Sequence, residues 1–129
     1  MHVGDSRFYV FRQGSLTQVT TDQTMAQLLV EENRITSDEA RSHPYSQLLD
    51  QSVGGPLCEP VTGSIKIKRG DLLLHTTDGL HDALSEQEII ERLAAWDTSL
   101  EDKAESLLRA ALHAGGKDNI TLVLTQLGS

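Results

Sequence analysis

The chain has 129 residues, of which 38% are hydrophobic and 23% are charged, and its formal net charge is -8. This length fits one domain or part of one, and the hydrophobic fraction allows a packed core and argues against disorder. The acidic charge argues against nucleic acid as the main partner, because phosphate backbones select basic surfaces. Bound cations or a basic substrate would suit this charge, although acidic helix surfaces in water are its more common cause.

The sequence contains a single cysteine, Cys58, so no disulfide can form within the chain, and a reducing compartment fits. It carries no signal peptide, no long apolar segment and no lipidation signal. We therefore expect a soluble cytoplasmic protein without a membrane partner.

The first part of the chain predicts a β-hairpin followed by two helices. Alternating apolar residues indicate the two strands, and capping-box signals open the helices. We place these elements at residues 3–11, 16–20, 24–32 and 36–42. Gly4-Asp5 is unusual inside a strand, because strand interiors disfavour both residue types. This pair therefore marks either the start of the strand or a functional site.

The rest of the chain predicts three more strands and two more helices. We expect a loop at residues 45–63, strands at 64–68, 72–74 and 120–127, and helices at 85–95 and 99–113. Runs of strands separated from pairs of helices are typical of an α+β fold with a mainly antiparallel sheet. No repeat or linker divides residues 1–129.

Two acidic segments stand beside predicted strands. The apolar run at residues 72–74 ends at Asp78-Gly79, and Asp118-Asn119 comes directly before the last strand. If these strands are neighbours, two carboxylates meet at one edge of the sheet, where a proton or a cation must join them. Magnesium and manganese prefer such oxygen ligands. Each segment taken alone is also typical of an ordinary turn.

Three segments together resemble the PP2C (PPM) family of metal-dependent protein serine/threonine phosphatases, of the bacterial type. They are Gly4-Asp5-Ser6-Arg7, the apolar strand that ends in Thr77-Asp78-Gly79-Leu80, and Asp118-Asn119-Ile120-Thr121. The resemblance implies part of an αββα sandwich and covers residues 1–129 as the C-terminal part of one phosphatase domain. The family's N-terminal half is absent, and with it an Asp-Gly pair that bridges two metals and an arginine that grips the phosphate.

The resemblance also implies a metal site and a substrate class. Asp78 and Asp118 would bind one of two Mg²⁺ or Mn²⁺ ions, Asp5 would join Asp78 at a third ion, and Gly79 would allow a close backbone approach. No catalytic side chain is expected beyond these ligands. The activity implied is hydrolysis of phosphate esters on phosphorylated proteins by metal-activated water, in signalling. Because part of the site is missing, we expect these residues alone to hydrolyse phosphate esters poorly or not at all.

The chain departs from the family pattern at two places. Asp22-Gln23-Thr24 stands where the family often has Asp-His-Ser, and Gln51-Ser52-Val53-Gly54 stands where it has Arg-Ala-Leu-Gly or similar. Two alternatives to an enzyme remain, a binding or regulatory module without catalysis and a structural fragment that self-associates through an open sheet edge.

None of the five histidines has the spacing of a zinc ligand. We expect His75 to be a packing residue inside its strand. We expect His81 to be exposed, with support of nearby Asp78 as the alternative.

Overall fold

The computed structural model describes residues 1–128. Their contacts divide the chain into two units. The helical unit comprises Met1–Ser6 and Thr21–Ser64, and the sheet unit comprises Arg7–Thr20 and the residues from Ile65 onward. No helix within residues 1–128 combines the length and the apolar character that a membrane span requires.

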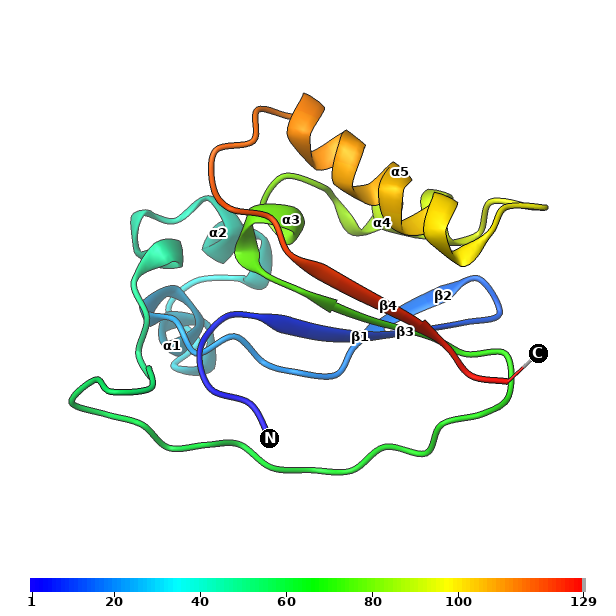
Figure 1. Cartoon of the computed structure of the whole chain (residues 1–129). Coiled ribbons are helices and arrows are strands. Elements are labelled where there is room, and N and C mark those ends of the chain that lie inside the picture. The colour runs from blue at the N-terminus through cyan, green and yellow to red at the C-terminus, as the bar shows by residue number, and fades with distance from the viewer. Residues whose placement is uncertain (129) are drawn as a thin grey trace. The chain divides into compact units, whose positions relative to one another are not determined.

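The sheet unit is built on a four-stranded antiparallel sheet in the order β2-β1-β3-β4 (Figure 1). Its strands are β1 (Arg7–Arg12), β2 (Ser15–Gln18), β3 (Leu72–Thr76) and β4 (Leu122–Gln126). Tyr9 in β1 lies opposite Leu74 in β3, and Leu74 lies opposite Leu124 in β4. The predicted hairpin, the buried strand and the last strand are therefore confirmed, as is the α+β class with an antiparallel sheet.

Three helices, α3 (Asp78–His81), α4 (Glu86–Leu93) and α5 (Leu100–His113), follow β3 in the sheet unit. Figure 1 shows α4 and α5 on one side of the sheet. Ser85 and Ser99 form capping boxes that open α4 and α5, as the sequence predicts. A single cluster of buried side chains joins the helices to the sheet; its fully buried members include Tyr9, Leu74, Leu80, Ile89 and Leu107.

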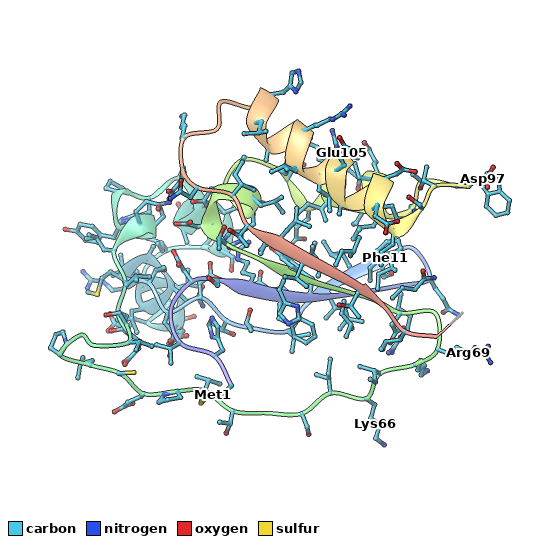
Figure 2. All side chains as sticks on the ribbon, viewed as in Figure 1. Met1, Phe11, Lys66, Arg69, Asp97 and Glu105 are labelled. Atoms are coloured by element: carbon cyan, nitrogen blue, oxygen red, sulfur yellow. The ribbon has the colours of Figure 1, made fainter. Side chains whose placement is uncertain are left out.

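The two faces of the sheet differ, because alternate residues of a strand point to opposite sides. Phe11 is 8% exposed within the core cluster, and Figure 2 shows it on the side of the sheet that faces α5. On the other face Val123 is 55% exposed. His75 is also exposed and stacks on the ring of Phe8 at 4.5 Å between centroids. His75 lies inside its strand, as expected, but it packs on Phe8 at an exposed face rather than in the core, because its place in the alternation of β3 turns it away from the helices.

An ion pair between a half-buried arginine and a buried aspartate joins the end of β1 to the turn before β3. Arg12 donates two hydrogen bonds to the carboxylate of Asp71, at 2.7 Å from Nε and 2.6 Å from Nη2. The backbone N–H of Lys68 donates a third at 2.7 Å. Asp71 is only 1% exposed, so these donors replace the water that its charge has lost. The hydrogen bonds from Arg12 and Lys68 lower the pKa of Asp71 from 3.8 to about 2.

The same contacts explain why residues 64–68 do not form the strand that their alternation predicts. The N–H of Lys68 bonds to Asp71, and the C=O of Lys66 accepts a bond of 3.1 Å from Arg12. These backbone groups bond to side chains rather than to a neighbouring strand. The predicted strand at 64–68 was therefore wrong.

The helical unit contains α1 (Met25–Glu31), α2 (Ser37–Ser42) and the 3₁₀ helix η1 (Pro44–Gln47). Both predicted helices are confirmed. Thr24 caps α1 through the N–H of Gln27, and Thr36 forms a capping box with Glu39 at the start of α2. Residues 48–63, within the predicted loop, contain no helix and only isolated β-bridges at Leu49 and Val61.

We predict that Asp71→Asn destabilises the protein at neutral pH and has less effect near pH 2. The folded-state pKa of Asp71 lies below 3.8, so the ionised carboxylate contributes stability above about pH 4 that is lost as the pH falls toward 2. Urea unfolding of both proteins from pH 2 to pH 7 measures this. A difference in unfolding free energy that stays constant across that range would contradict the prediction.

Candidate functional site

The candidate site begins where β3 ends. The strand stops at Thr76, Thr77 is the N-cap residue of α3, and Asp78 is the first residue of this one-turn helix. The sequence predicts the end of the strand at Asp78-Gly79 but not the helical turn. The turn is closed by backbone bonds, with Leu80 N–H donating to Thr77 O at 3.1 Å and Asp82 N–H donating to Asp78 O at 2.8 Å. Asp78 is half-buried on this turn.

The loop that carries Asp118 is held against the end of β3 by Thr77. The N–H of Thr77 donates to the C=O of Thr121 at 3.0 Å. The N–H of Thr121 donates back to the Thr77 hydroxyl, also at 3.0 Å. Since β3 and β4 pair antiparallel, with Thr76 opposite Leu122, the end of one strand meets the start of the other. The two strands are therefore neighbours, which is the condition under which the sequence predicts that the two acidic segments meet.

Gly79 is required by the closeness of this contact. A Cβ atom on Gly79 would lie 2.2 Å from the carbonyl oxygen of Asn119 and 2.9 Å from its carbonyl carbon. Both are backbone atoms, which cannot turn aside as a flexible side chain can. The missing side chain of Gly79 therefore lets the backbone of Asn119 approach, which brings the Asp118 loop onto the turn of Asp78. The role of Gly79 beside a metal ion stays a prediction.

The charge of Asp118 is among the causes that raise the pKa of Asp78. Burial, then the charge of Asp118, then that of Asp82 raise the pKa of Asp78. Hydrogen bonds from the backbone N–H groups of Gly79 and Asp78 itself oppose this rise. Asp118 is exposed, and its carboxylate accepts a bond of 2.7 Å from the N–H of Asn119.

The donor chemistry at this end of the sheet fits a hard divalent cation. Carboxylate oxygens are the ligands that Mg²⁺ and Mn²⁺ prefer, and a cation would relieve the repulsion that raises the Asp78 pKa. Two carboxylates do not complete a coordination shell. Within residues 1–128, no three or more His, Cys, Asp or Glu side chains gather closely enough to hold a metal ion by themselves.

Asp5 lies in the helical unit, in a bend before β1. The predicted strand at 3–11 begins only at Arg7, because Gly4 adopts a left-handed backbone with φ of 98°. Gln23 holds this bend: its Oε1 accepts from Gly4 N–H at 2.7 Å, and its N–H donates to Gly4 O at 3.0 Å. Its Nε2 also donates to Glu59 O at 3.2 Å. The role of Asp5 at a third ion stays a prediction.

Sequence reasoning gave no role to Thr77 and kept support of Asp78 by His81 only as the less favoured alternative. His81 is 4% exposed, and its Nδ1 lies 2.8 Å from the hydroxyl of Thr76. The expectation that His81 is exposed was wrong, because the turn of α3 directs it into the sheet unit. No spacing pattern identifies Thr77, because its partner Thr121 is 44 residues away, and the bond of His81 to Thr76 depends on the α3 turn between them.

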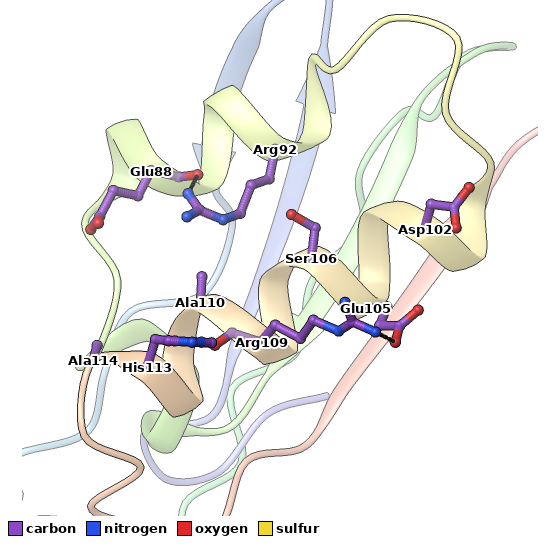
Figure 3. Close-up of a pocket in the computed structure, with 9 residues that line it drawn as sticks. All are labelled: Glu88, Arg92, Asp102, Glu105, Ser106, Arg109, Ala110, His113 and Ala114. Carbon is purple, nitrogen blue, oxygen red and sulfur yellow. Dashed lines mark hydrogen bonds and ion pairs between the residues drawn. The ribbon is translucent and has the colours of Figure 1, made fainter.

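A groove of about 650 Å³ lies between α4 and α5, on a different part of the sheet unit (Figure 3). None of the predicted site residues lines it. Its charged groups are used within the two helices: Arg109 pairs with Glu105, Arg92 donates to Glu88 O at 2.8 Å, and Asp102 caps α5. The groove therefore lacks converging unpaired ligands, and we place the candidate site at the end of β3.

The sheet unit is thus an antiparallel α+β structure with an acidic, oxygen-rich site where its central strand β3 ends. Comparison with known proteins extends this description. No model of a protein family matches the sequence. Over 127 residues, however, the chain is 40% identical to the serine/threonine protein phosphatase PstP of Mycobacterium tuberculosis, covering 98% of this chain and 24% of PstP. It is 36% identical to the protein phosphatase PhpP of Streptococcus pneumoniae, covering 98% of this chain and 51% of PhpP.

Solved structures agree with these relatives. The crystal structure of the M. tuberculosis phosphatase PstP/Ppp superposes with a TM-score of 0.91 at 41% identity, covering 99% of this chain and 54% of that one. The PstP catalytic domain in complex with two manganese ions superposes with a TM-score of 0.85 at 38% identity, covering 99% of this chain and 52% of that one. The chain belongs to the bacterial branch of the PP2C (PPM) family and corresponds to a C-terminal portion of its phosphatase domain. It spans about a quarter to a half of the length of these two curated relatives.

We predict that Gly79→Ala loosens the contact between the α3 turn and the Asp118 loop. The added methyl group would overlap the backbone of Asn119, and overpacking of this kind costs about 1–3 kcal/mol, occasionally more. Urea unfolding measures the loss of stability. Gly63→Ala is the control, because a Cβ there meets nothing within 4 Å and no positive φ is involved. Equal stability of Gly79→Ala and Gly63→Ala would show that the contact is not tight.

Proposed function

We propose that this chain forms part of a metal-dependent protein serine/threonine phosphatase, acting on phosphoserine and phosphothreonine in proteins. The observation that carries the proposal is the acidic pair at the end of β3, where the Thr77–Thr121 hydrogen bonds and the close contact of Gly79 with Asn119 hold the Asp118 loop against the turn of Asp78. Membership of the family and the relatives named as serine/threonine protein phosphatases support the reaction class. The neighbouring PstP structure that contains two manganese ions supports Mn²⁺ or Mg²⁺ as cofactor.

In this proposal Asp78 and Asp118 hold one ion of a pair, and Asp5 contributes to a third ion. Such ions, when bound, lower the pKa of a coordinated water and neutralise charge on a phosphate ester. The chain's own residues set the position of the carboxylates. Thr77 joins the α3 turn, which carries Asp78, to the loop that carries Asp118, through hydrogen bonds of its backbone N–H and its hydroxyl with Thr121. Gly79 lets the backbone of Asn119 approach this turn. Gln23 holds the bend that contains Asp5.

The charge of the chain is consistent with this role, since the net charge of -8 suits cations better than nucleic acid. A cytoplasmic location stays a prediction, as does the absence of membrane partners. Self-association through the edge of the sheet also stays a prediction.

The strand β4 lies at the edge of the sheet, and its Val123 is 55% exposed. Sedimentation at several concentrations tests self-association, and a strict monomer at high concentration would count against it.

We predict that the chain binds Mn²⁺ weakly and that Asp78→Asn and Asp118→Asn each weaken binding by about tenfold or more, because loss of a ligand costs at least as much as loss of its supporting partner. Electron paramagnetic resonance of free Mn²⁺ measures the binding. Asp97→Asn is the control, because Asp97 lies in the loop between α4 and α5 (Figure 2) and its substitution removes the same charge. If all three variants lost affinity equally, binding would reflect overall charge rather than a site.

We predict that the 129-residue chain alone turns over p-nitrophenyl phosphate with manganese poorly or not at all. Within residues 1–128, no group of three or more acidic, His or Cys ligands gathers at one place. Two carboxylates leave most of a two-metal site unfilled. Colorimetric release of p-nitrophenol measures turnover. Clear turnover that Asp78→Asn abolishes would contradict this expectation and show that these residues suffice for catalysis.

A further inference from the structure

The turn that carries Asp78 is closed by a buried polar pair. The hydroxyl of Thr76 and Nδ1 of His81 lie 2.8 Å apart, and the two residues are 3% and 4% exposed. Thr76 is the last residue of β3, and His81 is the last residue of α3. The pair therefore spans the segment that contains Asp78 and Gly79 and ties its two ends together.

The short helix α3 depends on contacts of this kind. It has only four residues, and its N-cap residue Thr77 makes no side-chain capping bond. Helices of one turn are not stable by themselves, because nucleation costs more than a single turn returns. Side-chain contacts help to hold α3 in place: Leu80 is fully buried in the core, and His81 bonds to Thr76.

The chemistry of the pair makes it selective for one conformation of the turn. A buried donor or acceptor that loses its partner costs free energy, so alternative turns that separate Thr76 from His81 are disfavoured. Every buried side-chain nitrogen and oxygen atom within residues 1–128 has a hydrogen-bond partner. An apolar side chain at position 81 could fill the same volume, but it would form no hydrogen bond with Thr76 that a rotation of the turn would have to break.

We propose that His81 is a positioning residue, which sets the direction of the Asp78 carboxylate by bonding to Thr76 across the α3 turn. The consequence for metal binding rests on the function proposed above. The alternative is that His81 only fills space in the core. Leucine at position 81 would satisfy that alternative, whereas asparagine carries a polar atom close to the place of Nδ1.

The variants that test this proposal are His81→Leu, His81→Asn and Thr76→Val. Hydrogen exchange followed by NMR measures the turn directly, through the amides of Asp82 and Leu84, which donate to Asp78 O and Leu80 O at 2.8 and 3.0 Å. We expect His81→Leu and Thr76→Val to exchange these amides faster by roughly tenfold, the factor that corresponds to loss of one hydrogen bond of about 1.4 kcal/mol. We expect His81→Asn to restore slow exchange.

The control is Leu93→Ala, which removes buried core volume in α4 and lowers global stability away from the turn. It should leave the ratio of exchange in α3 to exchange in β3 unchanged, whereas His81→Leu should raise that ratio. Slow exchange in His81→Leu, or the same ratio in both variants, would overturn the positioning role.

Binding of Mn²⁺ to the same variants separates this proposal from the proposed function. We expect affinity roughly three- to tenfold weaker in His81→Leu and Thr76→Val, less than the 10–100-fold typical of a partner bonded directly to a ligand, and recovered in His81→Asn. Unchanged affinity in all variants, with a wild type that binds Mn²⁺, would overturn the role of His81 and leave the metal site standing. A wild type that binds no Mn²⁺ would overturn the metal site, while faster exchange in His81→Leu would still support His81 as the residue that holds the turn.

Discussion

The pairing of β3 with β4 is the constraint on which the candidate site depends. The register places the last residue of β3 opposite the first residue of β4, and just beyond it Thr77 and Thr121 exchange two hydrogen bonds. These contacts bring together two acidic residues, Asp78 and Asp118, that are far apart in the sequence. The missing side chain of Gly79 lets the Asn119 backbone complete the contact, because any Cβ would occupy the same space.

Two carboxylates flank β3, and their surroundings shift their pKa values in opposite directions. Asp71, before the strand, receives two hydrogen bonds from Arg12 and has its pKa lowered to about 2. Asp78, after the strand, has its pKa raised by burial and by Asp118 and Asp82, and no basic side chain is among the groups that shift it. An ion pair inside the protein stabilises the first carboxylate, and the second retains repulsion that an external cation would relieve. This contrast identifies Asp71 as a structural acid and Asp78 as a candidate metal ligand, a distinction that their positions in the sequence do not make.

In the helical unit, a residue that departs from the family pattern has a structural role. Gln23 stands where the family often has histidine, yet its side-chain amide both accepts from Gly4 and donates to Glu59. An amide can do both because it carries an acceptor and two donors. In the same way, His81 is polar and buried rather than exposed, because the hydroxyl of Thr76 provides its partner.

The sequence alone determined the elements whose signals are local. Capping-box signals at Thr24, Thr36 and Ser85 and apolar periodicity predicted the main helices and the paired strands. Three short motifs indicated the family and named Asp78 and Asp118. Only the tertiary structure decided the rest. Residues 64–68 form no strand, because the backbone groups of Lys66 and Lys68 bond to the side chains of Arg12 and Asp71. His81 is buried although the sequence predicted that it is exposed, and His75 packs at an exposed face of the sheet. The physical reason is the same in each case: these outcomes depend on partners distant in sequence or brought together by folding, which periodicity and local propensity do not encode.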